Sequence, residues 1–415
     1  MSTAKQLSDA AWLVRGPAAR LLAVLDCDGE EARVVGGAVR NALMQIPVGE
    51  IDLATTAPPD EVTRRVTAVG FKAVPTGLEH GTVTVVVEGQ PFEVTTLRED
   101  VETYGRKAKV AFGRDWANDA RRRDFTINAL SASPAGNVYD YVGGLDDVAA
   151  RRVRFIGDAE QRIAEDYLRI LRFFRFHAHY GIGALDAAGL LACVRGRSGL
   201  DTLSRERVRM ELLRLLIAPR ATPTLAVMAE FGLLGPVLGG VSYIASFENM
   251  TKVEAAIGEP ADAVRRLGAL AVWVTEDAQR LSQRLRLFNV ESERLVALDR
   301  WWRVAPASEH AARVLLHEFD LQSFLDRVLI AWSRSEVGAA DRDWHHLATL
   351  PQRWTVPVFP LKSADFFSRG LSAGPALGVA MRAAKAAWID ADFAADRATL
   401  DAIADRAVAE TKKPL

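Results

Sequence analysis

The sequence contains few cysteines and no long apolar run. Only Cys27 and Cys193 occur in 415 residues, and they lie far apart, so neither a disulfide framework nor a zinc site is predicted. No tract of about 18 or more apolar residues is present, which argues against a membrane partner. Residues 1–6 lack the apolar run of a signal peptide. Together these absences predict a cytoplasmic protein.

The charge of the chain is almost balanced, with 52 lysines and arginines against 53 aspartates and glutamates. A polyanionic partner would therefore bind local basic patches and not the surface as a whole. Closely spaced arginines of that kind occur within residues 121–123, 151–154 and 205–209. The length and a hydrophobic content of 49% predict roughly two to four compact units with sizeable cores.

Hydrophobic periodicity predicts an α+β fold, in which a head with a mixed sheet is followed by an all-α neck, body and tail. Short β-rich runs at 34–35, 83–87 and 92–97 predict strands, whereas 8–26 and 58–69 have helical spacing. Further helices are predicted at 168–176, 205–217, 224–234 and through most of 260–350. No internal repeat is found.

Three domains are expected: the head at 1–150, the neck and body at 151–260, and the tail at 261–415. Between residues 98 and 116 the chain turns polar and loses its periodicity, so a mobile loop is predicted there.

Residues 34–56 carry the first functional signal. Gly36 and Gly37 follow a predicted strand and open a short helix, where bare backbone N–H groups suit a phosphate. The next strand is predicted to carry Glu50 and Asp52 on one face. Two parallel carboxylates beside a phosphate cradle suit a pair of hard divalent cations. Each signal alone indicates an ordinary turn or a solvated strand, but together they favour nucleotide chemistry.

Two further segments carry polar groups. Glu93 lies between apolar residues on a predicted strand, and it is either an edge-strand charge or a third carboxylate that acts as a base for an attacking hydroxyl. Arg122 and Arg123 have guanidinium forks that suit phosphate oxygens. Thr126 and Asn128 follow them and suit a sugar hydroxyl. The alternative for this second segment is a solvated basic helix start.

Residues 165–176 have the pattern of an amphipathic helix, except that Phe176 falls among the charges. Its charged residues are Glu165, Asp166, Arg169, Arg172 and Arg175. A carboxylate accepts from the exocyclic amine of cytosine or adenine, while a guanidinium donates to the ring nitrogen. Guanine and uracil present the opposite pattern and would leave both groups unpaired. Asp166 and Arg169 are therefore able to select C and A without a template, unless they only form ion pairs on a solvated helix.

These motifs resemble those of the class II tRNA nucleotidyltransferases, the bacterial CCA-adding enzymes and poly(A) polymerases. The matching segments are Gly36-Gly37-Ala38-Val39-Arg40, Glu50-Ile51-Asp52, Arg122-Arg123-Asp124-Phe125-Thr126 and Glu165-Asp166-Tyr167-Leu168-Arg169-Ile170-Leu171-Arg172. Ser204-Arg205-Glu206-Arg207, followed by Glu211, resembles the next motif of the family more weakly.

The resemblance implies a polymerase-β-like head, a neck helix that selects the nucleotide, and helical domains that hold tRNA. It implies that Glu50 and Asp52 bind the divalent ions, expected to be two Mg²⁺. Glu93 is the further catalytic candidate, because of its place on the predicted strand. The implied substrates are CTP, ATP and tRNA. The implied nucleotide-binding residues are Gly36, Gly37, Arg40, Arg122, Arg123, Asp166, Arg169, Arg172 and Arg175.

Two positions depart from the family pattern, because aspartate usually stands where this chain has Asn41 and Glu50. Three functions therefore compete: full CCA addition, a poly(A) polymerase or A-only tRNA nucleotidyltransferase, and a catalytically impaired RNA-binding relative. The segment 98–116 favours full CCA addition over a CC-only enzyme, because that loop is short or missing in CC-adding relatives. The basic-aromatic signature of the poly(A) branch is absent at 80–85.

Overall fold

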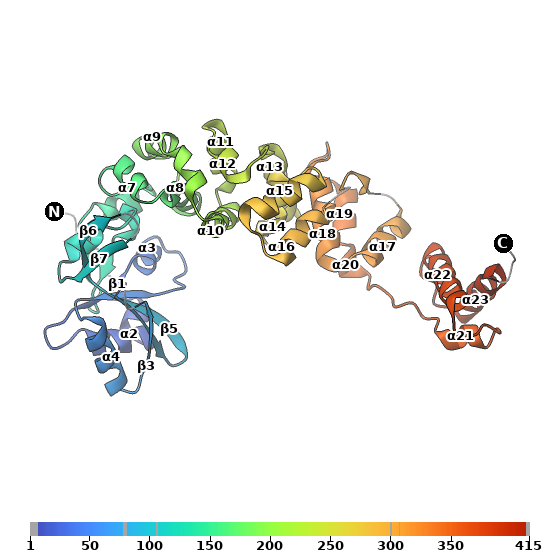
Figure 1. The fold of residues 1–415 in the computed structure, drawn as a ribbon, viewed down its shortest axis with the longest axis horizontal. Helices are drawn as coiled ribbons and strands as arrows, with labels where there is room; N and C mark the ends of the chain where they lie inside the picture. Colours follow the sequence, from blue (N-terminus) through green and yellow to red (C-terminus); the bar gives the residue numbers. More distant parts are fainter. Residues whose placement is uncertain (1–6, 78–80, 105–106, 299–300, 307, 412–415) are drawn as a thin grey trace. The chain divides into compact units, whose positions relative to one another are not determined.

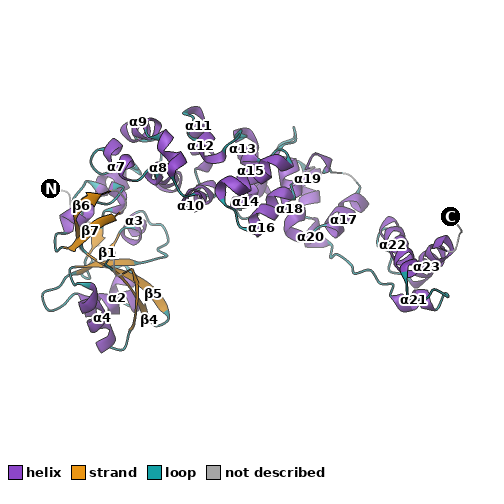
Figure 2. Cartoon of the chain, viewed as in Figure 1, coloured by secondary structure: helices purple, strands orange, loops and turns teal. Residues whose placement is uncertain are grey.

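The structure, a computed structural model, describes residues 7–77, 81–104, 107–298, 301–306 and 308–411. The chain divides after Gly239 into two compact units. All strands of the described residues belong to the first unit, and the second unit is helical (Figures 1 and 2). None of the described helices combines the length and the apolar character that a membrane crossing requires. The division into three domains at residues 150 and 260 stays a prediction.

A seven-stranded mixed sheet forms the centre of the head. Its strand order is β3-β4-β5-β2-β1-β8-β9. Only the β2–β5 pair is parallel among these neighbours. The strands are β1 (Ala32–Val35), β2 (Asp52–Thr55), β3 (Lys72–Gly77), β4 (Thr82–Val87), β5 (Gln90–Thr96), β8 (Ser131–Ala132) and β9 (Val138–Tyr139). The strands predicted at 34–35, 83–87 and 92–97 are confirmed, whereas β3, β8 and β9 were not predicted. Strands β8 and β9 have only two residues each, too few to show a period.

Six helices accompany the sheet: α1 (Ala11–Val14), α2 (Pro17–Leu25), α3 (Gly37–Leu43), α4 (Pro59–Ala68), α5 (Trp116–Arg121) and α6 (Gly144–Ala149). The helical stretch predicted at 8–26 is split into α1 and α2, since Gly16 has a φ of +94° and Pro17 opens α2. Helices α2 and α4 pack on each other and on the sheet (Figure 1). The short η2 helix (Thr126–Asn128) follows the second arginine motif.

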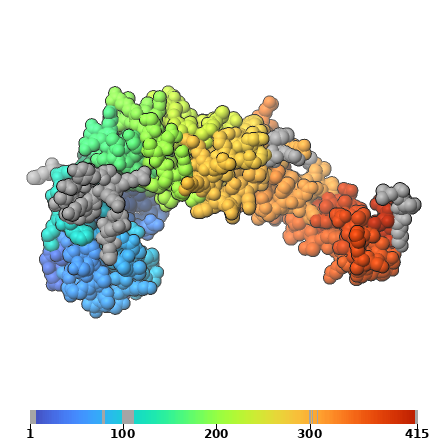
Figure 3. All heavy atoms as spheres, viewed as in Figure 1, coloured from blue at the N-terminus to red at the C-terminus, as the bar shows by residue number. Residues whose placement is uncertain are grey.

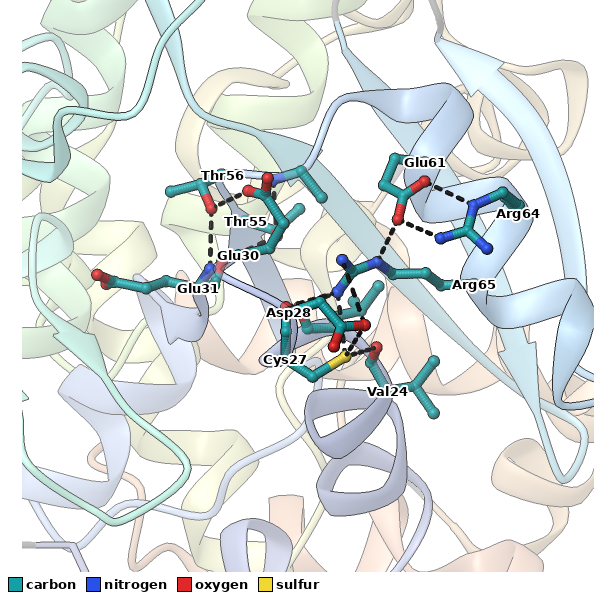
Figure 4. Close-up of polar contacts among 12 residues, drawn as sticks. Val24, Cys27, Asp28, Glu30, Glu31, Thr55, Thr56, Glu61, Arg64 and Arg65 are labelled. Carbon is teal, nitrogen blue, oxygen red and sulfur yellow. Dashed lines mark hydrogen bonds and ion pairs between the residues drawn. The ribbon is translucent and has the colours of Figure 1, made fainter.

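Arg65 of α4 fastens the loop that leads from α2 to the sheet (Figure 4). Its Nη1 donates to the carbonyl of Cys27 at 2.8 Å, and its Nε donates to Glu61 at 2.5 Å. Nearby, the Thr56 hydroxyl accepts from the backbone N–H of Glu31 at 2.8 Å. The Arg65 bonds tie this loop to α4, and the Thr56 bond joins the start of β1 to the end of β2, at the opposite end of the strand pair from Val35 and Asp52.

The predicted loop at 98–116 is wrong, because most of this segment forms a separate two-stranded hairpin. Strand β6 (Arg98–Tyr104) pairs antiparallel with β7 (Lys107–Phe112). The sequence signal was weak because the acidic residues of β6 and the lysines of β7 give this segment a polar composition. The register sets the two compositions against each other, with Glu102 opposite Lys109. Residues 105–106 at the turn lie outside the described residues.

Helices continue the first unit beyond the head: α7 (Ala159–Glu165), α8 (Leu168–Tyr180), α9 (Ala187–Arg195), η3 (Arg197–Thr202), α10 (Arg205–Leu216), α11 (Ala221–Glu230) and α12 (Leu234–Leu238). The helix predicted at 168–176 is confirmed as α8, whereas the amphipathic pattern over 165–176 is interrupted at Asp166, which is extended with a φ of −155°. The predicted helix over 224–234 ends at Glu230, since Gly232 has a φ of +69°.

An aromatic cluster joins the head to α8. The ring of Phe125 lies 4.9 Å from that of Phe155 and 5.2 Å from that of Phe176. Phe155 stacks on Phe173 at 5.3 Å. Phe125 and Phe173 are fully buried. The charged face of α8 is therefore held in place by the packing of its opposite face.

The second unit consists of helices, as predicted. They are α13 (Ile244–Ile257), α14 (Ala263–Ala271), α15 (Thr275–Leu285), α16 (Asn289–Val296), η4 (Trp301–Arg303), α17 (Glu309–Glu318), α18 (Leu321–Ser333), α19 (Arg342–Ala348), α20 (Leu350–Arg353), α21 (Ser363–Phe367), α22 (Pro375–Asp390) and α23 (Arg397–Thr411). The last three share a core around Phe366 and Trp388 (orange-red to red in Figure 3).

Candidate active site

All the predicted catalytic, metal-binding and nucleotide-binding residues line one cleft of about 670 Å³ in the first unit. Thr126, predicted to suit a sugar hydroxyl, does not line it, because its hydroxyl is buried and donates to Asp147 at 2.6 Å. Strands β2 and β5 contribute Asp52 and Glu93, and the loop before β2 contributes Glu50. Helix α3 contributes Gly37 and Arg40, and α8 contributes three arginines. The lining residues among the predictions are Gly36, Gly37, Arg40, Glu50, Asp52, Glu93, Arg122, Arg123, Asp166, Arg169, Arg172 and Arg175. Their individual roles stay predictions, but their convergence on one cavity is a property of the fold.

The glycine turn differs in one respect from the prediction. Gly36 has a φ of +69°, and an added Cβ would lie 3.3 Å from the Nη1 of Arg123, so only glycine suits this position. Its N–H donates to the carbonyl of Leu130 at 2.9 Å. The sequence predicted that the N–H of Gly36 would be bare. In the structure it is already hydrogen-bonded to Leu130, just before strand β8. Gly37 is the first residue of α3.

Three carboxylates lie at the edge of the sheet beside this turn. Asp52 opens β2 and pairs with Val35, the residue before Gly36. Glu93 lies on the adjacent parallel strand β5. Glu50 precedes β2, so the prediction that it lies on the strand is wrong, although it still lines the cleft. Loss of hydration raises the pKa of Asp52, and the negative charges of Glu93 and Glu50 raise it further.

The donor set fits divalent cations that also bind the phosphates of a substrate. Oxygen ligands are what hard cations prefer, and mutual repulsion among carboxylates is relieved when a cation binds between them. Within the part of the chain that the structure describes, no group of three or more acidic, histidine or cysteine side chains is arranged so that it could hold a metal ion by itself. Magnesium commonly uses one or two carboxylates and takes its other ligands from phosphate and water.

Arg40 is a buried cation with uncharged partners. Its side chain is 5% exposed. Its guanidinium donates to the amide oxygens of Asn41 and Asn128 and, at 2.7 Å, to the hydroxyl of Tyr180. It also lies 3.8 Å from the centre of the Tyr180 ring. Burial lowers the pKa of Arg40 to about 10, so the side chain remains positive near neutral pH.

Six other arginines along the cleft each pair with a carboxylate. On α8, Arg172 contacts Asp124 at 2.5 Å and Arg175 contacts Glu211 at 2.5 Å. The pairing residues are Arg122 and Arg123 with Asp119, Arg169 with Glu165, Arg172 with Asp124, Arg175 with Glu211, and Arg207 with Asp166. These pairs hold the guanidinium groups in defined orientations around the cavity.

Asp166 and Arg169 both face the cleft, but each binds another side chain. One oxygen of Asp166 accepts from the backbone N–H of Leu168 at 3.1 Å, and the other accepts from Arg207 at 2.5 Å. Arg169 donates to Glu165 at 2.5 Å and to a backbone carbonyl. The extended backbone at Asp166 is what turns its carboxylate toward the cleft at the start of α8.

Phe176 broke the amphipathic pattern, and the structure explains why. Its ring is 7% exposed and lies under three guanidinium groups: those of Arg175 at 4.3 Å, Arg172 at 5.4 Å and Arg40 at 5.5 Å. The face of an aromatic ring attracts cations, so a phenylalanine among arginines gathers them.

Sequence reasoning missed several residues that line the cleft. Asp119 and Tyr180 were not singled out, and Arg207 was noted only within a weak motif. Tyr180 lies four residues after Phe176 on the same helix, a spacing that placed it on the cleft side.

Two family models match the chain. Residues 32–154 match the Poly A polymerase head domain. Residues 190–244 match the model described as a probable RNA and SrmB-binding site of polymerase A.

Curated relatives extend the match to most of the chain. The mitochondrial CCA tRNA nucleotidyltransferase 1 of Homo sapiens is 31% identical over 366 residues, which cover 87% of this chain and 83% of that protein. The CCA-adding enzyme of Leuconostoc citreum is 39% identical over 216 residues, or 52% of each chain. A crystal structure of the Bacillus stearothermophilus CCA-adding enzyme in complex with CTP has a TM-score of 0.70 and 29% identity, covering 91% of this chain and 93% of that one.

Proposed function

The chain belongs to the family of CCA tRNA nucleotidyltransferases, and we propose that it adds C, C and A from CTP and ATP to the 3′ end of tRNA without a template. The observation that carries this proposal is the convergence of the phosphate turn, the carboxylates and the base-selecting pair on one cleft. Nucleotidyl transfer, base selection and a dependence on divalent metal all fit this one cavity.

The transfer is a displacement at the α-phosphorus of the nucleotide. The 3′ oxygen of the tRNA forms the new P–O bond, the bond to the bridging oxygen breaks, and pyrophosphate leaves. Glu93 is proposed to accept the proton of the attacking hydroxyl, since it lies on β5 beside Asp52. Arg40, Arg122 and Arg123 would bind the phosphate oxygens, and Asn128 in the adjoining turn would orient the sugar.

Glu50 and Asp52 would hold the divalent metal that the family requires, proposed here to be two Mg²⁺ ions. Bound there, the ions would activate the attacking hydroxyl and neutralise charge on the phosphates. The side chain of Glu50, one methylene longer than the usual aspartate, reaches the cleft from the segment before β2.

Base choice is proposed to reside in Asp166 and Arg169. Arg207 and the N–H of Leu168 fix the Asp166 carboxylate, so that its remaining lone pairs accept from an exocyclic amine. Arg172 and Arg175 lie on the same side of α8 and would contact the base and the triphosphate. The body and tail helices would hold the tRNA.

The decisive test is single-nucleotide incorporation by the purified protein on tRNA that lacks its 3′ CCA. CTP alone should add two residues, and ATP should then add one. Repeated addition of A alone would instead identify a poly(A) polymerase, and binding of tRNA without incorporation would identify an impaired relative.

The proposed compartment is the cytoplasm. It is supported by the scarcity of cysteine, although relatives of this chain include proteins named as mitochondrial. Fractionation of cells that produce the tagged protein would decide between the two.

A further inference from the structure

Asn41 connects the phosphate side of the cleft to the loop that precedes the carboxylates. It lies on α3, and its side-chain oxygen accepts from Arg40 Nε at 3.1 Å and from Arg40 Nη2 at 2.8 Å. Its Nδ2 donates to the carbonyl of Pro47 at 3.2 Å. Its own carbonyl accepts from the N–H of Ile46 at 2.9 Å. One side chain thus holds a guanidinium and also the loop that leads to Glu50.

The charge of Arg40 is not compensated by direct contact with any carboxylate of the described residues. Its acceptors are Asn41, Asn128 and Tyr180, all of which are neutral. Asp124 reaches Arg40 only through Asn128, whose amide donates weakly to that carboxylate at 3.4 Å. Six neighbouring arginines bind carboxylates directly, so Arg40 differs from them in kind. A buried cation with neutral partners keeps its attraction for an incoming anion.

A carboxylate at position 41 would change both contacts. It would accept from Arg40 as a charged partner and so neutralise the guanidinium. It could not donate to Pro47, because an ionised carboxylate has no proton, and its oxygen would face the Pro47 carbonyl. The amide is therefore suited to a cleft in which Arg40 must remain available to an anion.

We propose that Asn41 is a positioning residue that keeps the positive charge of Arg40 available to the triphosphate of the incoming nucleotide and holds the loop before Glu50. This inference rests on the proposed function, since it takes the anion to be CTP or ATP. It assigns a role to an amide at the position where the family pattern has a carboxylate.

The test is calorimetric titration of CTP into the full-length protein and its variants in EDTA, so that neither metal nor turnover contributes. Asn41→Asp should weaken CTP binding about tenfold at low salt, because an ionised side chain now pairs with Arg40. The loss should become smaller at high salt, where charges are screened. Asn41→Ala removes the amide without adding charge and should stay within about threefold of the parent.

A control variant separates local from general electrostatics. Asn137→Asp adds the same charge at an exposed position of the head outside the cleft lining, and it should bind CTP as the parent does. Equal weakening by Asn41→Asp and Asn41→Ala would refute the charge argument. Unchanged affinity of Asn41→Asp, with its thermal transition preserved, would refute any role of Asn41 in binding. If the parent itself bound no CTP, the proposed function would fail as well.

Discussion

Single residues of the cleft have to be considered with their partners. The arginines that pair with carboxylates are fixed in orientation, and each pair contains a charge that becomes uncompensated when the other is removed. Breaking a buried pair costs more than the pair contributes, because the remaining charge loses both its partner and its hydration. Substitutions in this cleft should therefore be judged on binding, turnover and folding together.

Removal of the Asp52 carboxylate should abolish nucleotide incorporation. Asp52→Ala eliminates the proposed metal ligand at the start of β2, while the surfaces proposed to hold tRNA are unchanged, so tRNA binding in a filter assay should persist. The matched variant Glu50→Asp, which shortens the other ligand to the form usual in the family, should retain activity. Continued turnover by Asp52→Ala would remove Asp52 from the metal site.

The pH dependence of metal binding should follow the raised pKa of Asp52. A carboxyl with a raised pKa holds its proton to a higher pH than an ordinary aspartate at about 3.9. The ionisation of Asp52 therefore destabilises the folded state as the pH rises through the raised pKa of this group. Metal binding is lost as the pH falls through the same raised pKa. Binding of Mn²⁺, followed by electron paramagnetic resonance against pH, should show this midpoint.

Glu93→Gln gives the matched comparison for that titration. It removes one of the negative charges that raise the pKa of Asp52, so the midpoint for Mn²⁺ binding should move to lower pH. An unchanged midpoint would mean that Glu93 does not act on Asp52 through its charge.

Base selection should depend on Asp166 and Arg169. Each lost charged hydrogen bond is worth about 1.5–3 kcal/mol, so Asp166→Ala and Arg169→Ala should reduce discrimination against UTP and GTP by roughly ten- to a hundredfold. Incorporation assays with each of the four nucleotides measure this ratio. A structural ion pair predicts instead a lower thermal transition with the preference for CTP and ATP intact.

At the scale of elements, the β6–β7 hairpin can be shortened without changing the strands of the seven-stranded sheet, so its role can be tested separately. It follows β5 directly and forms its own sheet, and Arg98 at its start lines the cleft. If it repositions the base-selecting residues between C and A addition, shortening it should leave CC addition intact and block the final A. Gel analysis of the products distinguishes the two steps. Equal loss of both would indicate a purely structural role.

A helix or strand could be predicted where its apolar residues recur with a regular period and so form one apolar face. Helices such as α4 and strands such as β4 alternate apolar and polar residues with a clear period, and they were found. The hairpin has many charged residues, and this polar composition was mistaken for that of a loop. The break at Asp166 was missed because the charges on both sides of it fit one continuous helical pattern.

The site residues were found largely because they occur in compact motifs, but their partners were not. Nothing in the sequence indicates that Arg40 reaches Tyr180, which lies 140 residues later. Such a contact depends on how α3 packs against α8. The position of Gly36 was predicted, whereas the use of its N–H by Leu130 depends on strand β8, which was missed.

At the scale of the whole molecule, the two units should respond separately to core substitutions. Trp388 is 1% exposed in the core of α21–α23, and its indole N–H donates to Ala394 at 2.9 Å. Trp388→Ala should destabilise this bundle by about 3–5 kcal/mol. Calorimetry should show that this bundle unfolds at a lower temperature than in the parent. The affinity for tRNA should fall, while the affinity for CTP stays unchanged. Trp388→Phe is the milder control, and a parallel loss of CTP binding would show that the units are coupled.

The pairing of Asp52 with Val35 limits how this chain tolerates insertions and deletions. Side chains alternate between the two faces of a strand, so one residue inserted within β1 or β2 would turn the strand residues beyond it to the other face. The turn at 45–49 lies outside both strands and is bound through Ile46 and Pro47 to Asn41. Insertions and deletions between β1 and β2 in related sequences should therefore be confined to that turn. They should be accompanied by replacement of Asn41.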